Sequence, residues 1–296
     1  MIHYKSLENT DEKIILETHN NAFSDYQVQM NWTLPQFQNI NKQRGVRYDL
    51  SIGAFDDDKL VGFIINGAGD WNNKPTVYDC GTGIIKEYRH TGIGTEILLR
   101  LITLLRDMGI FQYLLEVIKT NENAYQLYLK QGFEIIREFD CAVAEIARIK
   151  KKIEERKEDI QIILNDKDFE ICEITQPNWD IYKKFWDKPP SWQNSIQSIE
   201  RNREVLAILG INHKGTPVGY AAFDPRNAGI AQFAIHPEYR RRKLGIVLLE
   251  QIIMRAPTAK RVSIINIDKR LSSFIGFYEN LGFKLFAEQY EMMKII

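Results

Sequence analysis

The stretch IIKEYRHTGIG at residues 84–94 decides the fold, because a similar stretch, IHPEYRRRKLG, occurs again at residues 235–245. Both contain Glu-Tyr-Arg with a glycine five residues after the arginine. Two further pairs of similar segments lie at nearly the same spacing, about half the chain length: LYLKQGF (127–133) with FYENLGF (277–283), and VGF (61–63) with VGY (218–220). Collinear similarity at one spacing indicates two copies of one fold.

This repeat, together with a length of 296 residues, predicts two domains. We expect residues 1–140 to form the first domain, which we predict to be catalytic, and residues 159–296 to form the second, which we predict to be degenerate. Residues 141–158 form a charged connector, most of which belongs to the run ARIKKKIEERKED at residues 147–159. This run fits either a solvated helical linker or an extension of the first domain's last element.

The composition is that of a soluble globular protein, with 44% hydrophobic and 26% charged residues. Lys plus Arg equals Asp plus Glu at 39 each, which argues against binding to nucleic acid or a membrane surface. Three widely spaced cysteines without a CxxC motif make a disulfide framework or a metal site improbable. The first residues do not resemble a signal peptide, and no long apolar run is present. We therefore expect a cytoplasmic protein.

The hydrophobic patterns predict a mixed α/β fold, with an early antiparallel hairpin followed by strands that alternate with helices. In the first copy we expect helices near 11–23, 95–109 and 121–130, and strands near 50–55, 60–66, 76–85 and 113–118, with another strand after Gly132. The second copy repeats this order, with a helix that begins near Leu244.

The glycines of Arg89-His90-Thr91-Gly92-Ile93-Gly94 lie at a predicted strand-to-helix junction. The N-terminus of a helix attracts anions, and glycine lets a pyrophosphate approach the backbone. A Rossmann fingerprint is disfavoured because a third glycine would be needed at Ile97, and a P-loop is excluded because G-K-[ST] is missing.

The motif R-x-x-G-x-G at 89–94, followed by Leu115-Glu116-Val117, Asn121-Glu122-Asn123-Ala124 and LYLKQGF, resembles the GNAT superfamily of acyl-CoA-dependent N-acetyltransferases. The second copy resembles the same family through residues 235–283. The tandem arrangement is similar to that of mycothiol synthase and related bacterial two-domain proteins. The resemblance therefore implies two tandem GNAT-like acyl-CoA N-acyltransferase domains and acetyl-CoA as co-substrate, with no metal.

The resemblance also implies where acetyl-CoA binds. Backbone groups of Thr82, Gly83 and Ile84 would pair with the pantetheine arm where the sheet splays open. Asn121 occupies the family's position for a side chain that contacts the pantetheine. The pyrophosphate would lie on the loop and first helical turn that follow the strand, formed by Arg89, His90, Thr91, Gly92, Ile93, Gly94 and Thr95.

Transfer of an acetyl group from a thioester to an amine needs a neutral amine and a proton for the departing thiolate. Tyr128 matches the family's proton-donating tyrosine, with a core tyrosine as the alternative. Glu116 matches the position of a general base, and a structural ion pair is its alternative. Asp79, on the preceding strand, is a less favoured base that would act through a water. Alignment of the two substrates alone could also supply much of the acceleration.

The second copy departs from the family pattern. Lys243 stands where the first copy has Gly92, although Gly245 matches Gly94 and Tyr278 matches Tyr128. Asn266 and Leu271 stand at the positions of Glu116 and Asn121. We therefore expect the second copy to serve packing and the walls of the substrate cleft, with a site that uses the charge of Lys243 as the alternative.

The sequence thus predicts an N-acetyltransferase that acts on a primary amine of a small molecule or a peptide. It identifies neither this acceptor nor the oligomeric state. The alternatives are a non-catalytic acyl-CoA-binding or regulatory protein on the same scaffold, and an enzyme that transfers a different acyl group.

Overall fold

The computed structural model describes residues 1–26 and 30–296 of the chain. They form two compact units, of which unit 1 comprises Met1–Ile136 and Tyr290–Ile296, and unit 2 comprises Arg137–Gln289. This division differs from the sequence-based boundaries at two places. The C-terminal residues belong to unit 1, and the residues of the charged connector belong to unit 2.

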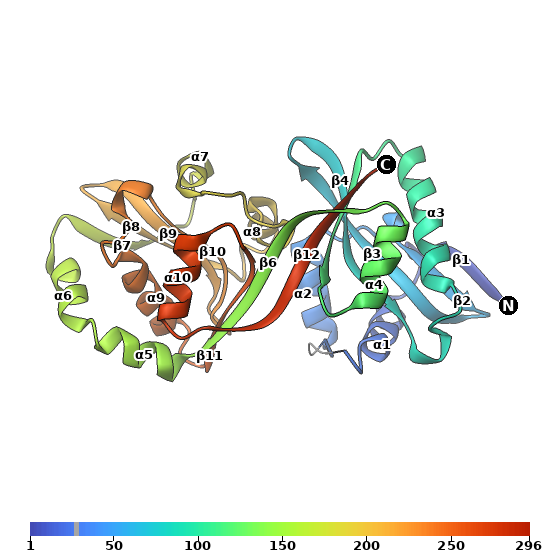
Figure 1. Ribbon diagram of the computed structural model, residues 1–296, viewed down its shortest axis with the longest axis horizontal. Helices are drawn as coiled ribbons and strands as arrows, with labels where there is room; N and C mark the ends of the chain where they lie inside the picture. The colour runs from blue at the N-terminus through green and yellow to red at the C-terminus, as the bar shows by residue number, and fades with distance from the viewer. Residues whose placement is uncertain (27–29) are drawn as a thin grey trace. The chain divides into compact units, whose positions relative to one another are not determined.

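The strands and helices that the sequence predicts for unit 1 occur in the predicted order, but they are preceded by a strand that was not predicted (Figure 1). Its elements are β1 (Ile2–Ser6), α1 (Glu12–Ala22), α2 (Leu34–Arg44), β2 (Ile52–Asp56), β3 (Lys59–Trp71), β4 (Lys74–Ile84), α3 (Ile93–Asp107), β5 (Gln112–Ile118) and α4 (Glu122–Lys130). The sheet has the order β1-β2-β3-β4-β5-β12, and its last strand is β12 (Lys284–Ile295) from the end of the chain. The backbone N–H of Ile296 donates to the carbonyl of Phe111, directly before β5.

Unit 2 repeats this architecture. Its elements are β6 (Glu134–Glu145), α5 (Ile146–Glu154), α6 (Lys157–Asn165), β7 (Phe169–Glu173), α7 (Trp179–Tyr182), α8 (Ile196–Arg201), β8 (Ala207–His213), β9 (Thr216–Asp224), β10 (Gly229–Ile235), α9 (Leu244–Arg255), β11 (Arg261–Asp268) and α10 (Ser272–Asn280). The sheet has the order β6-β11-β10-β9-β8-β7. The predicted mixed α/β fold is confirmed, since β4–β5 and β10–β11 are parallel pairs among antiparallel neighbours.

The strands that complete the two sheets come from the opposite halves of the sequence. β6 follows α4 along the chain but pairs with β11, from Glu145 opposite Arg261 to Phe139 opposite Asp268. β12 follows α10 but is the neighbour of β5 in the sheet of unit 1. Repeat similarity could not reveal this exchange, because it fixes which segments are equivalent and not which copy each strand joins.

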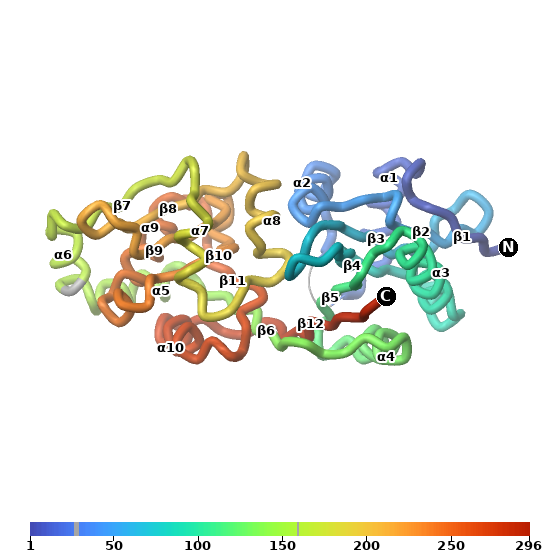
Figure 2. Tube along the Cα trace, turned by 90° about the horizontal axis from the view of Figure 1, so that it is seen from above, coloured from blue at the N-terminus to red at the C-terminus, as the bar shows by residue number. Residues whose placement is uncertain are grey.

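The helices of unit 1 cover both faces of its sheet. α1 and α3 both contact β3 and β4, and Figure 2 shows α1 and α2 on one side of these strands and α3 on the other. α3 is amphipathic because its apolar residues recur every three or four positions and are buried: Ile93, Ile97, Leu98, Leu101, Ile102 and Leu105. The sequence analysis missed α2, although Thr33 and Gln36 form a capping contact at its start and Gly45 ends it in the left-handed conformation.

The charged connector is ordered as the end of β6 followed by α5 and α6. α5 buries Ile146, Ile149 and Ile153 on one face and contacts α9, so its charged residues occupy the solvated face. The connector is therefore helical in part and also extends β6, which combines the two alternatives. Among the helices described, none is long and apolar enough to cross a membrane.

Candidate active site

The site in unit 1 begins where two parallel strands stop pairing. β4 and β5 pair from Thr76 opposite Gln112 to Tyr78 opposite Leu114, and no described residues continue this pairing. On its other edge β4 stays paired with β3 as far as Ile84, with a register shift at Cys80. The backbone of Thr82, Gly83 and Ile84 is therefore paired on the β3 side alone, and its other edge can accept an extended ligand.

Close packing explains the glycine at position 83. A Cβ on Gly83 would lie 2.6 Å from Cζ of Phe63 and 3.1 Å from the Cβ of Ala22. Any larger side chain would push β4 away from β3 or from the end of α1. Glycine therefore keeps the end of β4 in place.

The N-terminus of α3 lies after this strand end and carries the predicted glycine loop. Gly92 is the N-cap residue and has a left-handed backbone with φ of +87°. A Cβ there would have no neighbouring atom within 4 Å, so the space in front of the helix is open. The N–H groups of Ile93, Gly94 and Thr95 are in the first helical turn, where no carbonyl of the helix can accept from them. This end of α3 suits an anion.

His90 and Thr91 shape the loop before Gly92. His90 has φ of +63° and is exposed. Thr91 is also exposed, and its hydroxyl donates to the carbonyl of Tyr88 at 2.6 Å. Together with Gly92, the two residues turn the chain from β4 into α3.

The Arg89 side chain holds this loop to the rest of unit 1. Its Nε donates to the carbonyl of Ile84 at 3.1 Å, and one terminal nitrogen donates to the carbonyl of Ala22 at 2.8 Å. The guanidinium also forms a two-bond ion pair with Asp25, at 2.7 and 2.8 Å. These contacts indicate that Arg89 positions the loop, whereas the sequence analysis grouped it with the residues that bind the co-substrate.

A carboxylate and two hydroxyl groups meet beside the end of β4. Tyr128 of α4 donates its hydroxyl to Oδ2 of Asp79 at 3.0 Å, and Thr82 donates to the same oxygen at 2.6 Å. Gly81 donates its backbone N–H to Oδ1 at 2.8 Å. Burial and the Asp79 charge raise the pKa of Tyr128 well above its usual value, and burial also raises the pKa of Asp79. Tyr128 is therefore protonated at neutral pH, as a proton donor must be.

Glu116 and Asn121, the remaining predicted site residues, have contacts of their own. Glu116 is half-buried on β5 and forms a hydrogen bond with Tyr78, whose pKa is raised by burial and then by this carboxylate. Asn121 caps α4 by accepting from the N–H of Ala124 at 3.3 Å, and Tyr26 is also bonded to it. The two predicted catalytic residues, Tyr128 and Glu116, thus contact different partners.

The structure adds residues that the sequence analysis did not connect to the site. Asp25, the partner of Arg89, and Tyr26, the partner of Asn121, lie just after α1 and carry no motif. The direct contact between Asp79 and Tyr128 was also missed, because the two residues are far apart in sequence. The sequence analysis put Asp79 among the candidate bases because of its place on the strand before Glu116, but it could not identify the partner of Asp79. Within the described ranges, no cluster of His, Cys, Asp or Glu side chains could hold a metal ion.

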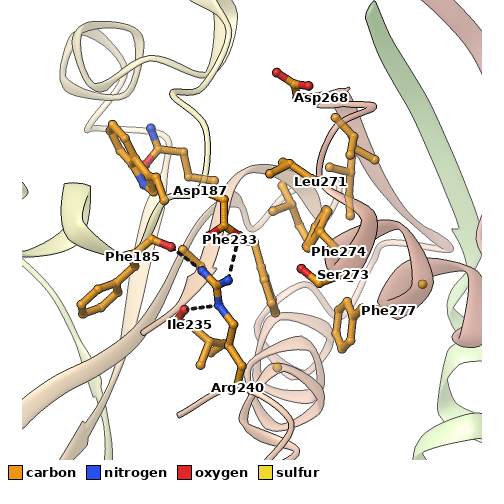
Figure 3. A pocket seen from close by; sticks show the side chains of 18 of the residues that line it. Phe185, Asp187, Phe233, Ile235, Arg240, Asp268, Leu271, Ser273, Phe274 and Phe277 are labelled. Carbon is orange, nitrogen blue, oxygen red and sulfur yellow. Dashed lines mark hydrogen bonds and ion pairs between the residues drawn. The ribbon is translucent and has the colours of Figure 1, made fainter. Parts of the chain in front are cut away.

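Unit 2 contains a cavity of about 750 Å³ at the equivalent place. β10 and β11 pair only at Gly229–Ser263 and Ile230–Ile264, and the cavity lies between their diverging ends, the start of α9 and α10. Figure 3 shows its aromatic wall, where Phe233 from β10 lies near Phe274 and Phe277 of α10. The ring centroids of Phe233 lie 6.0 Å and 5.7 Å from those of Phe274 and Phe277.

The loop before α9 keeps the backbone shape of the loop before α3. Lys243 is the N-cap residue with φ of +65°, and Arg241 has φ of +62°, as Gly92 and His90 do in unit 1. The other two residues that differ from the first copy, Leu271 and Asn266, stand in place of Asn121 and Glu116. Leu271 begins α10 without a side-chain cap, and Asn266 is held by Ser191 and Gln289.

Comparison with known proteins places these observations in a family. The family model for the acetyltransferase (GNAT) family matches residues 13–133 and 170–283. The matched parts coincide with the two copies, so the predicted tandem GNAT architecture is confirmed. No curated protein matches the chain.

Several solved structures share the whole fold. A tandem GNAT protein from the clavulanic acid biosynthesis pathway has a TM-score of 0.71 and 15% identity, over 100% of this chain and 98% of its own. A GCN5-related N-acetyltransferase from Sphaerobacter thermophilus has a TM-score of 0.71 and 11% identity, over 99% and 95%. A putative acetyltransferase from Pyrococcus horikoshii has a TM-score of 0.64 and 16% identity, over 100% and 89%. At these identities the likeness concerns the fold.

Proposed function

Because the chain belongs to the acetyltransferase (GNAT) family, we propose that it transfers an acetyl group directly from acetyl-CoA to a primary amine, with the reacting centre in unit 1. One observation carries this proposal. The protonated hydroxyl of Tyr128 forms a hydrogen bond with Asp79 beside the open edge of β4. The end of β4 is in turn close in sequence to the glycine loop before α3.

The shape of unit 1 supports binding of an extended, anionic co-substrate. The free edge of Thr82–Ile84 can pair with the amides of a pantetheine arm as an added strand would. The N–H groups of Ile93–Thr95 point toward the open space at Gly92, where a pyrophosphate would be stabilised by the helix dipole. Arg89 then acts on the loop and not on the phosphates.

The chemistry requires a proton to leave the amine and a proton to reach the thiolate. The amine nitrogen attacks the thioester carbonyl, the C–N bond forms, and the C–S bond breaks with its electron pair on sulfur. Tyr128 is the proposed donor to sulfur, because its raised pKa keeps it protonated. Glu116 and Asp79 are the two candidate carboxylates for the amine proton.

We infer that the acceptor is a small molecule or peptide with a primary amine, in the cytoplasm. The test measures thiol release from acetyl-CoA with a panel of polyamines, aminoglycosides and peptides with free N-termini. Turnover of at least one amine by the wild type, and its loss in Tyr128→Phe, supports the proposal. Acetyl-CoA binding without turnover of any amine would favour a binding or regulatory protein, and turnover of other acyl-CoA esters alone would favour a different acyl transfer.

A second candidate places acyl-CoA binding in unit 2. The cavity there favours it, because it lies at the diverging ends of β10 and β11 and reaches the start of α9. Lys243 would contribute a cation in place of the backbone approach that Gly92 allows. Variants at Gly92 in unit 1 and at Gly245 in unit 2 separate the two assignments in a binding titration.

A further inference from the structure

The Asp79 carboxylate lies at the centre of a buried hydrogen-bond cluster. Asp79 is 8% exposed and accepts three hydrogen bonds, from Gly81, Thr82 and Tyr128. Thr82 and Tyr128 both donate to Oδ2, so this oxygen has a fixed orientation toward the Tyr128 hydroxyl. No Lys or Arg in the described part of the chain forms an ion pair with it. The charge of Arg44 also favours the ionised carboxylate, but the direct partners of Asp79 are these three hydrogen-bond donors.

Such a carboxylate takes up a proton more readily than an exposed one. Burial raises the pKa of Asp79 and outweighs the three donors and the charge of Arg44, which favour the charged form. The Tyr128 hydroxyl lies beside the open edge of β4, because Thr82 of that edge donates to the same Asp79 oxygen as Tyr128. A proton can therefore pass between Asp79 and a group beside Tyr128 through one hydroxyl.

This inference rests on the proposed function. We propose that Asp79 and Tyr128 form a two-residue proton relay, in which Tyr128 exchanges protons with the reacting groups and Asp79 stores the proton between the two halves of the reaction. Asp79 acts through Tyr128 and is thus a positioning residue. The relay replaces a water between Asp79 and the amine, and it needs no contribution from Glu116 to the proton transfers.

The proton movements balance without a further reactant. When the amine nitrogen has formed its bond to the carbonyl carbon, it gives a proton to the Tyr128 oxygen, while Tyr128 passes its own proton to Oδ2 of Asp79. When the C–S bond breaks, Tyr128 gives a proton to sulfur and takes one back from Asp79. One proton has moved from nitrogen to sulfur, and both side chains return to their starting state.

Unit 2 supplies a matched pair that lacks the features of the relay. Tyr278 also donates to a carboxylate, Oδ2 of Asp140, at 3.2 Å. However, Asp140 belongs to β6, and its Oδ1 lies 3.6 Å from Nζ of Lys269. Ile230 of β10 stands at the position that Asp79 has in β4. Asp140 is therefore ion-paired where Asp79 is not, which makes it the natural control.

The kinetic test uses the full chain, acetyl-CoA and the amine of the panel that is acetylated fastest. We expect Asp79→Asn to lower kcat at least about tenfold, because the relay loses the group that stores the proton, with acetyl-CoA affinity unchanged. It should also remove the acidic limb of the pH profile, and Asp79→Glu should restore both in part. The double variant with Tyr128→Phe should be no slower than Tyr128→Phe alone, because both changes break one relay. Asp140→Asn should leave the pH profile of the reaction unchanged.

A second measurement does not depend on turnover. Burial and the Asp79 charge raise the pKa of Tyr128, and the pKa of buried Tyr113 is raised in the same way, so Asp79→Asn should let both tyrosines ionise at lower pH than in the wild type. Ultraviolet titration of tyrosinate detects this, and the contribution of Tyr128 should be absent from Asp79→Asn/Tyr128→Phe, which leaves that of Tyr113. An unchanged tyrosine titration, an unchanged pH profile, or multiplied losses in the double variant would each overturn the relay. A wild type that acetylates no amine would instead overturn the proposed function.

Discussion

Arg240 makes in unit 2 the same set of contacts that Arg89 makes in unit 1. In each, Nε donates at 3.1 Å to the carbonyl of the last strand residue before the loop, and the guanidinium pairs with an aspartate at 2.7 Å. In each unit, a terminal nitrogen of the arginine also donates to the carbonyl of the last residue of a helix. The carbonyls are those of Ile84 and Ala22 for Arg89 and of Ile235 and Phe185 for Arg240, and the aspartates are Asp25 and Asp187. The arginine of the repeated motif is therefore a structural residue in both copies.

We predict that Arg89→Ala lowers the free energy of unfolding by about 1–3 kcal/mol, because two carbonyls and Asp25 lose a charged donor. It should also weaken acetyl-CoA binding, since the loop before α3 loses its anchor. Urea unfolding and calorimetry measure the two effects. Arg100→Ala is the control, because it removes an exposed helical pair with Glu96 and a cation–π contact with Tyr4 but leaves no carbonyl without a donor, and it should change stability by about 1 kcal/mol at most.

At the loop itself, we predict that Gly92→Glu abolishes acetyl-CoA binding in a protein that still folds. The carboxylate would repel the phosphates at a helix N-terminus, while the added Cβ meets no atom within 4 Å. The positive φ of +87° adds strain of about 1–2 kcal/mol, and Gly92→Ala isolates this cost without the charge. Calorimetry on both variants checks the assignment. Unchanged affinity in folded Gly92→Glu would show that the phosphates bind elsewhere.

For catalysis, Tyr128→Phe should lower kcat at least about tenfold, as expected for a lost general acid, with little change in acetyl-CoA affinity. The substitution removes only the hydroxyl group, and the ring at position 128 keeps its contact with Phe133 at a centroid distance of 5.6 Å. Tyr278→Phe is the matched variant in unit 2 and should retain activity. Loss of activity in Tyr278→Phe with normal activity in Tyr128→Phe would move the reacting centre to unit 2.

The repeat and the hydrophobic patterns were sufficient to predict the mixed sheet, the tandem architecture and most elements of both copies. They could not predict that β6 and β12 complete sheets in the opposite halves of the sequence, because equivalent strands satisfy the same pattern in either sheet. Within the site, the sequence could name Asp79, Glu116 and Tyr128 as candidate catalytic residues. Which carboxylate contacts the Tyr128 hydroxyl depends on how α4 lies against β4, and this is a property of packing that spacing does not contain.

Stability should also depend on pH through His19, which the sequence analysis did not consider. His19 is 2% exposed, stacks on Trp32 at 4.4 Å and has its pKa lowered by burial from 6.5 to about 4. Above pH 6.5 both the folded and the unfolded chain hold it neutral, so its contribution to stability is complete there. As the pH falls from 6.5 toward 4, the unfolded chain binds the proton first and stability is lost, by about 3 kcal/mol as an order of magnitude.

Urea unfolding at a series of pH values tests this dependence. His19→Phe should remove most of the loss between pH 6.5 and 4, because the aromatic contacts remain and no group has to be protonated. His3→Gln, which changes an exposed histidine, should leave the loss unchanged. An equal acid dependence in the wild type and His19→Phe would assign it to the carboxylates instead.

The last prediction concerns the two copies, and we expect one strong acetyl-CoA site per chain. In unit 2 a lysine occupies the N-cap of α9, so its Cβ and flexible side chain stand where Gly92 leaves open space, and ordering a lysine ammonium costs side-chain entropy. Phe277 also approaches α9 closely, since a Cβ on Gly245 would lie 3.1 Å from its ring. Equilibrium titration of the wild type should therefore give a stoichiometry near one, which Gly92→Glu removes and Gly245→Glu retains. Two sites of similar affinity, or one site that survives Gly92→Glu and disappears with Gly245→Glu, would show that the cavity of unit 2 holds the co-substrate.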